Sequence, residues 1–331
     1  MPNLQKHFID FHTKIKLDNF NENQTLREKR DLLINDLKAG LPEDTPIFEY
    51  FDQGSYAMYT GIIPKDGNYD IDVGIIFNCY KDEYSDPVDL KKIIRDTLNK
   101  GNRSVAIRRP CVTVEYHKNG EVDYHVDLAI YVKREYESIY DIGMGKEFSE
   151  AEKRFWEISD PKGLIDLINN RFSYADDKAQ MRRCIRYLKK WRDKKLYSGR
   201  PFSIALTVAA YKWFSPYNDI FGEGYQDINA LIQFCDEMLN NFDYRDWLTI
   251  NLPVQPYKDL NAKMTQSQMN TFQDNLETLR DALIEARDED LEEKACKILR
   301  KQFGDDFPVP ESSETSKKAA VAGFAPSGSS A

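Results

Sequence analysis

Two aspartates stand two residues apart at the start of a segment that alternates in polarity. If residues 70–77 form a strand, Asp70 and Asp72 share one face, because side chains two apart in a strand point the same way. The apolar residues between and after them then share the other face and pack into the core. Two adjacent carboxylates repel each other unless a cation lies between them, and such oxygen ligands suit Mg²⁺ or Mn²⁺. The pattern therefore predicts a divalent metal site.

A third acid has a similar place in a second predicted strand, residues 122–132. Asp127 precedes the most apolar part of this strand, as Asp72 does in its own. If the strands are neighbours, three carboxylates meet and can hold two metal ions. Two ions about 3.5–4 Å apart stabilise both the attacking and the leaving oxygen of a phosphoryl transfer. Asp123 lies on the same face and is the alternative third ligand, although we favour Asp127.

The dipeptide Gly54-Ser55 lies just upstream of the acid pair and could hold phosphate. Glycine allows a backbone to approach an anion closely. Ser55, before a short predicted helix, offers hydroxyl and amide donors. A Gly-Ser pair alone is typical of loops. We interpret this pair as a phosphate-binding turn only because it lies just before the two acids.

A basic helix is predicted at residues 177–195. Arg182, Arg186 and Lys189 fall along one face, beside an apolar stripe that we expect to be buried. Such a face is usually solvated, but in an acidic chain with a carboxylate site it favours contact with a triphosphate. Ser203, near the start of the next predicted helix, is placed for another phosphate contact.

The elements that must position these residues fall into an α+β half followed by a helical half. Strand patterns end at about residue 148, which places the expected domain boundary near residue 150. The expected strands are 46–51, 70–77, 104–117 and 122–132. The expected helices are 4–15, 23–39, 89–99, 162–172, 177–195, 201–213, 227–240 and 270–303. We predict a catalytic lobe at 1–150, a helical lobe at 151–305 and a flexible tail at 306–331, the last because its composition cannot offset ordering entropy.

The amino-acid composition and net charge limit the kinds of molecule that the protein is expected to bind. The 331 residues are 41% hydrophobic and 31% charged, as in globular proteins, and carry a formal net charge of -9. This charge argues against long nucleic acid as a partner, while small nucleotides stay compatible with it. The five cysteines form no metal-ligand or disulfide pattern, which favours a reducing cytoplasm. No signal peptide or membrane span is expected.

Taken in order, Gln53-Gly54-Ser55, Asp70-Ile71-Asp72 and Asp127 resemble the nucleotidyltransferase superfamily of DNA polymerase β. Within it, residues 20–300 are most similar to the bacterial cGAS/DncV-like nucleotidyltransferases of cyclic-oligonucleotide antiphage signalling. The resemblance implies a polymerase β-like lobe with a mixed sheet, a helical lobe and an active-site cleft between them. It also implies two Mg²⁺ ions, with Mn²⁺ as a substitute, on the three acids. Donor phosphates would contact Gly54, Ser55, Lys189 and Ser203.

The resemblance further implies that nucleoside triphosphates, ATP among them, are joined into a cyclic di- or trinucleotide with release of pyrophosphate. In some such systems a ubiquitin-transfer-like partner conjugates the C-terminal residue, which here is Ala331. The chain departs from the family in two ways. The fourteen residues between Ser55 and Asp70 are slightly more than usual, and no Cys/His cluster exists for DNA-dependent activation.

Two other functions fit part of the pattern. A metal-dependent glycosyltransferase could use Asp70 and Asp72 to bind a nucleotide-sugar, but it needs neither the Gly-Ser pair nor the third acid. The βαβ order usual for such enzymes is also absent from the pattern. A catalytically idle nucleotide-binding module would have no need of three metal ligands.

Overall fold

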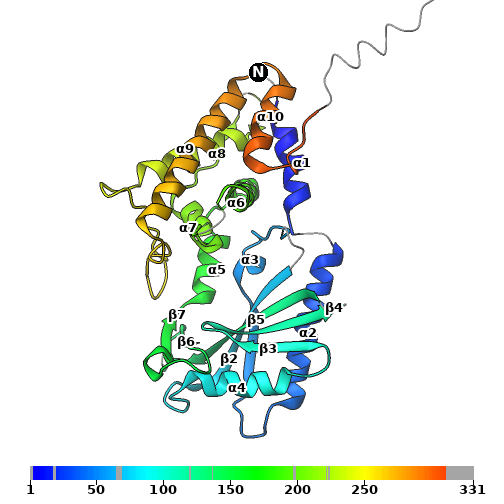
Figure 1. Cartoon of the computed structure of the whole chain (residues 1–331), viewed down its shortest axis with the longest axis vertical. Helices are drawn as coiled ribbons and strands as arrows, with labels where there is room; N and C mark the ends of the chain where they lie inside the picture. Colours follow the sequence, from blue (N-terminus) through cyan, green and yellow to red (C-terminus); the bar gives the residue numbers. More distant parts are fainter. Residues whose placement is uncertain are drawn as a thin grey trace, which may run out of the picture.

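The computed structural model describes residues 3–17, 20–64, 69–118, 121–135, 137–196, 199–220, 222 and 224–310 (Figure 1). Its strands are β1 (Phe48–Asp52), β2 (Tyr69–Tyr80), β3 (Arg103–Ile107), β4 (Cys111–Lys118), β5 (Glu121–Lys133), β6 (Tyr140–Met144), β7 (Phe155–Ser159), β8 (Asn218–Asp219) and β9 (Gly224–Tyr225). Its α-helices are α1 (Gln5–Ile15), α2 (Phe20–Gly40), α3 (Gly54–Ala57), α4 (Pro87–Leu98), α5 (Pro161–Asn169), α6 (Ala175–Lys195), α7 (Ser203–Trp213), α8 (Asp227–Asn240), α9 (Gln266–Asp288) and α10 (Glu292–Phe303).

A seven-stranded mixed sheet forms the first half. Five strands run in the order β1-β2-β5-β4-β3. In addition, β6 pairs with β5 on one side and with β7 on the other. β2 and β5 are parallel, whereas the other pairs in this sheet are antiparallel. The alternation in residues 70–77 has the predicted effect, since Ile71, Val73 and Ile75 are fully buried under α2 and α4. The predicted α+β class and mixed sheet are confirmed.

The second half is a helical core arranged around α6. Trp191 and Tyr187 of this helix are fully buried. The N-terminal helix α1 also packs here, because Phe8 lies 5.3 Å from the Tyr187 ring and 6.2 Å from the Phe303 ring, measured between centroids. Figure 1 shows α1 beside α10, although α1 precedes the sheet in the chain. The lobe boundaries at residues 150 and 305 remain predictions.

Three expectations about the elements are wrong. Strands continue past residue 148, since β7 pairs with β6 and β8 pairs with β9; these strands are too short to show a period. The expected strand 104–117 is two strands that pair antiparallel, with Pro110 at the turn between them, because proline cannot donate to a ladder. The expected helix 270–303 is likewise two helices, α9 and α10.

Phe307, the second residue of the predicted tail 306–331, is fully buried. Its ring lies 5.3 Å from that of Phe8 and 5.2 Å from that of Phe11. Residues 311–331, and with them the prediction that Ala331 is conjugated, lie outside the described residues. Among the helices that the structure describes, none combines the length and the apolar character needed to cross a membrane.

Candidate active site

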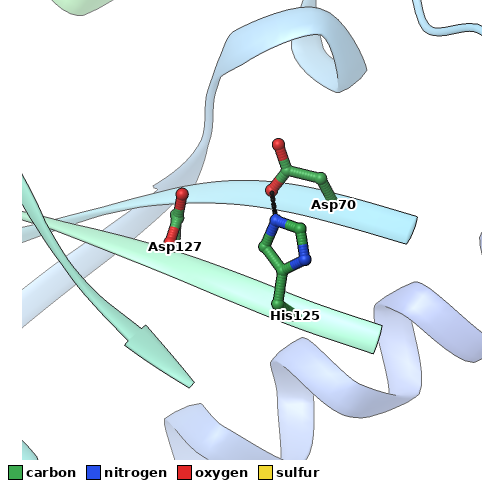
Figure 2. A group of neighbouring side chains, drawn as sticks. All are labelled: Asp70, His125 and Asp127. Atoms are coloured by element: carbon green, nitrogen blue, oxygen red, sulfur yellow. Dashed lines mark ion pairs between the residues drawn. The ribbon is translucent and has the colours of Figure 1, made fainter. Parts of the chain in front are cut away.

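The parallel pairing of β2 and β5 brings the predicted acids together. In this register Asp72 lies opposite Asp127, and Asp70 lies opposite His125. Nε2 of His125 is 3.2 Å from Oδ1 of Asp70. One potential ligand atom from each of Asp70, His125 and Asp127 lies within 4.8 Å of the others, and Figure 2 shows the three side chains converging from the two strands.

His125 is a site residue that the sequence interpretation missed. It lies two residues before Asp127, so the two-residue period already placed it on the same face as the acids. Hydrogen bonding with the Asp70 carboxylate raises the pKa of His125, and burial works against this shift. Asp123, the alternative third ligand, lies on β5, and its side chain is outside the described residues.

Asp72 is turned toward the Gly-Ser dipeptide. The backbone N–H of Gln53 donates to the carbonyl of Asp72 at 3.0 Å, which fixes the start of α3 against β2. Gly54 has a φ of +64°, and a Cβ built on it would lie 1.9 Å from Oδ2 of Asp72. The absence of a side chain at residue 54 therefore allows the carboxylate and the α3 turn to be in contact.

The negative charges of this cluster repel one another, and His125 and Lys189 offset only part of that repulsion at Asp72. Burial, followed by repulsion from Asp70 and Asp127, raises the pKa of Asp72 to about 7. Burial also raises the pKa of Asp127, while a hydrogen bond from the Thr113 hydroxyl to its Oδ1, at 2.5 Å, lowers it. A bound divalent cation would relieve the repulsion that raises these values. The carboxylate oxygens are hard ligands, so the donor set fits Mg²⁺ or Mn²⁺.

Asp72 and Asp127 line two different cavities. One, of about 420 Å³, is lined by Gly54 and Asp72 on the sheet side and by residues such as Ile204 on the helical side. The other, of about 380 Å³, is lined by Asp127 together with Thr113 and His125. Pro110 lines both. Each of these two cavities therefore has one carboxylate of the facing pair Asp72 and Asp127 at its wall.

The predicted phosphate contacts Lys189 and Ser203 have partners within the protein. Nζ of Lys189 is buried and donates to the carbonyl oxygen of Thr60 at 3.0 Å and to its hydroxyl at 3.1 Å. Burial, and then the charges of Arg192 and Arg186, lower the pKa of Lys189 to about 7. The Ser203 hydroxyl accepts a hydrogen bond from Nη1 of Arg192 at 2.9 Å. Neither side chain is part of the cavity wall beside Asp72.

The arginines of the basic helix line a different cavity from the one at Asp72. Arg182 and Arg186 line a separate cavity of about 900 Å³, to which α3 contributes Ser55 rather than Gly54. Arg186 donates to the carbonyls of Tyr59 at 2.6 Å and Gly61 at 3.0 Å. The face of α6 that carries these arginines lies under residues 59–61, and the structure does not bring it to the acids.

Comparison with known proteins agrees with this geometry. Residues 48–131, which contain the Gly-Ser pair and the three acids, match the family model of the nucleotidyltransferase domain of cyclic GMP-AMP synthase DncV-like proteins. A cyclic GMP-AMP synthase from Escherichia albertii is 30% identical over 174 residues. That match spans 49% of this chain but only 36% of the relative's length.

Solved structures share the fold over most of the chain. The structure of Vibrio cholerae DncV cyclic AMP-GMP synthase with the linear intermediate 5′ pppA(3′,5′)pG has a TM-score of 0.71 at 17% identity. The same enzyme with nonhydrolyzable GTP has a TM-score of 0.72 at 16% identity. Both matches cover 92% of this chain and 97% of the other. At such identities the likeness establishes the fold, including the helical half that the family model leaves out.

Proposed function

We propose that the chain, whose residues 48–131 match the DncV-like nucleotidyltransferase domain, joins nucleoside triphosphates into a cyclic di- or trinucleotide with release of pyrophosphate. The observation that carries the proposal is the contact of Gly54 with Asp72, in parallel register with Asp127. This arrangement puts a phosphate-binding turn and a metal-binding acid cluster in one place. The structures of Vibrio cholerae DncV with the pppA(3′,5′)pG intermediate, with nonhydrolyzable GTP, and of its D193N mutant with ATP and GTP support ATP and GTP as substrates here.

In this proposal each compartment holds one reactant. The donor triphosphate lies on Gly54 and Ser55, and its α-phosphate lies at Asp72. Lys189 and Ser203 would add phosphate contacts by exchanging their present hydrogen bonds with Thr60 and Arg192 for bonds to the phosphates. The acceptor ribose lies in the compartment of Asp127, whose Oδ1 accepts a hydrogen bond from the Thr113 hydroxyl. Asp127 would help the bound metal to deprotonate the attacking hydroxyl. The acceptor oxygen bonds to the α-phosphorus, and the bond between the α-phosphorus and the bridging oxygen breaks. Pyrophosphate leaves with those electrons.

Asp70, Asp72 and Asp127 would hold two Mg²⁺ ions, or Mn²⁺ in their place, which stabilise the charge on the attacking and leaving oxygens. Asp70 is also fixed by its contact with His125, which limits the positions that its carboxylate can take. A second transfer between the ends of the linear product would close the ring. From the family resemblance we further infer that the product is a signal in antiphage defence and that the protein acts in the cytoplasm.

The test is incubation of the protein with radiolabelled nucleoside triphosphates and Mg²⁺ or Mn²⁺, followed by chromatographic identification of the product. Wild type should release pyrophosphate and form a phosphatase-resistant cyclic product. The double variant D70N/D72N should form none. D290N, which changes an exposed acid in the bend between α9 and α10, is the matched control and should equal wild type. Product formation that survives D70N/D72N would refute the assignment, and turnover of a UDP-sugar would favour a glycosyltransferase.

A further inference from the structure

A lysine lies fully buried on α4, the helix that packs against β3, β4 and β6. Lys91 stands in the apolar stripe of this helix, between Leu90 and Ile94, which are also fully buried. The acid whose charge acts on Lys91 is Asp86, and that carboxylate is paired with Arg154 at 2.7 Å. The lysine is therefore a buried cation whose closest partners have to be sought in the backbone.

Three carbonyl groups surround the ammonium group of Lys91. Nζ donates to the carbonyl oxygen of Arg109 at 2.8 Å, to that of Gly145 at 3.2 Å and to that of Arg108 at 3.3 Å. An ammonium group has three donors and no acceptor, so these carbonyls use its full capacity. Burial lowers the pKa of Lys91 to about 8, and the charged form with all three donors therefore predominates at neutral pH. These bonds tie α4 to two other segments of the chain.

The first of these segments is the turn of residues 108–110 between β3 and β4. The carbonyl of Arg109 accepts not only from Lys91 but also from the N–H of Gly145, at 2.9 Å. Pro110 has no N–H and cannot donate a hydrogen bond of its own. The position of Pro110 therefore depends on the bonds that the carbonyls of Arg108 and Arg109 accept.

The segments that Lys91 joins belong to the walls of the candidate site. Pro110 lines both the cavity at Asp72 and the cavity at Asp127. Arg108 also lines the cavity at Asp127, and Met144, at the end of β6, lines the cavity at Asp72. The turn and the end of β6 therefore have to keep their relative position if the two cavities are to keep theirs.

Stability alone does not account for a charged residue at this place. Replacement of buried charged groups by apolar residues of similar volume is often neutral or stabilising, and the neighbours of Lys91 on its own helix face are apolar. What a lysine adds, and an apolar residue could not, is a fixed position for three carbonyl groups. The hydrogen bonds of Lys91 therefore point to a role in the geometry of the site.

We propose that Lys91 is a positioning residue for the nucleotidyl transfer, an inference that rests on the proposed function. Its ammonium group holds the turn 108–110 so that the donor at Asp72 and the acceptor at Asp127 meet at the reacting distance. Without it three buried carbonyls lose their donor, and the turn has to move to reach water. A displacement of about 1 Å between reacting groups lowers a rate by about a hundredfold.

The test compares wild type with K91M, which keeps a long unbranched side chain and removes the three donors. The initial rate of product formation at saturating nucleotide should fall roughly ten- to a hundredfold. Calorimetric affinity for a non-reacting GTP analogue with Mg²⁺ should change by less than about threefold, because one bound nucleotide does not need the two cavities to be aligned. K92M is the matched control, since Lys92 is the next residue on α4 and pairs with Asp89 at 3.4 Å. It should equal wild type in both measurements.

Hydrogen exchange of the nucleotide-free proteins gives a readout that does not depend on activity. The N–H of Gly145 donates to a carbonyl that Lys91 also holds. This amide should exchange about tenfold faster in K91M, as for loss of one hydrogen bond to a charged group, whereas amides of α6 should keep their wild-type rates. Faster exchange confined to the turn and the end of β6 would support the inference, and unchanged exchange at Gly145 would overturn it.

A second variant covers the case in which K91M does not fold. P110G changes an exposed residue of the turn and leaves the buried lysine in place. It should lower the rate about tenfold and leave the affinity for the analogue within about threefold of wild type. An unchanged rate in K91M, or in P110G where K91M does not fold, refutes the role of Lys91 while wild type still forms cyclic product. Absence of product from wild type refutes instead the proposed function.

Discussion

Gly54 and Asp72 are in such close contact that no larger residue can occupy position 54 without displacing the carboxylate. A Cβ there would lie 1.9 Å from Oδ2 and 2.7 Å from Cγ of Asp72. The contact joins the turn that we assign to phosphate with an acid that we assign to metal. The distance between these two sites is therefore set by van der Waals contact, which is a more exact constraint than their separation in the sequence.

We expect G54A to lower the rate of product formation by about a hundredfold, because displacement of a reacting group by about 1 Å costs that much. Part of any effect could come from the backbone, since φ at this residue is +64°. G101A is the matched control: φ at Gly101 is +69°, and a Cβ there meets nothing within 4 Å. Both variants should lose about 1 kcal/mol of stability through the backbone. Initial rates and thermal unfolding measure the two effects, and equal rates for G54A and G101A would contradict the prediction.

The raised pKa of Asp72 predicts how stability depends on pH. A carboxyl group whose pKa is higher in the folded chain favours folding at low pH. Its contribution is complete below the unfolded value of about 3.9, and it is lost as the pH rises through about 7. Without metal, D72N should therefore gain stability over wild type as the pH rises from about 5 to about 8. Thermal unfolding of both proteins across this range measures the difference.

The pKa of Lys189 is also lowered to about 7, and the charges of Lys189 and Asp72 attract each other. The comparison is therefore repeated in a K189M background, where the loss of the Asp72 carboxyl cannot act through Lys189. Mg²⁺ should raise the melting temperature of wild type more at high pH than at low pH, because its ligands must be deprotonated. D290N, which changes an exposed acid, should follow the wild-type curve. A pH profile of D72N that parallels wild type would show that this carboxyl is not strained in the metal-free protein.

The sequence was most informative where a regular element carries the residues. Alternation in β2 gave the shared face of Asp70 and Asp72, and the similar place of Asp127 before an apolar run correctly predicted neighbouring strands. The register decides the rest: a parallel pairing with Asp72 opposite Asp127 also sets His125 opposite Asp70. A single strand pattern holds no information about its register, so the contact of His125 could be found only in the fold.

Contacts between segments far apart in the chain were not predictable. Lys189 lies on a predicted helix, but its partner is Thr60, 129 residues away in the loop after α3. The wall of the Asp72 cavity contains Lys258, from a loop without any periodic pattern. Burial of Phe307 likewise depends on α1, which reaches the helical core from the other end of the chain. In each case the packing of distant elements decides the environment, and local sequence does not record it.

Thr113 should act as a positioning residue for Asp127. The two residues lie opposite each other on β4 and β5, and the hydroxyl donates to Oδ1 at 2.5 Å. T113V keeps the volume and removes the donor, so product formation should fall about tenfold, as for loss of one hydrogen bond to a charged group. T113S keeps the donor and should restore the rate. The concentration of Mg²⁺ that gives half-maximal rate should rise for T113V and stay unchanged for T113S, whereas a purely structural role would lower stability alone.

Lys189 is the last residue that we test, because its charge depends on whether an anion is bound. In the nucleotide-free protein its pKa is lowered to about 7, so its charged fraction falls as the pH rises through this value. A triphosphate that contacts Nζ favours the charged form, and binding above about pH 7 must then take up a proton. We therefore expect the affinity of wild type for GTP to decrease as the pH rises from about 6.5 to about 8.5.

K189M should bind GTP roughly ten- to a hundredfold more weakly, since a hydrogen bond to a charged group is lost, and its affinity should vary less with pH. K190M is the matched control, because Lys190 is the next residue on α6 and pairs with Asp306 at 2.6 Å. Calorimetric titration with a non-reacting GTP analogue at several pH values measures both properties. If K189M binds the analogue as wild type does, the ammonium serves only to hold Thr60, and the donor phosphates must be neutralised by the metal ions and the backbone of α3.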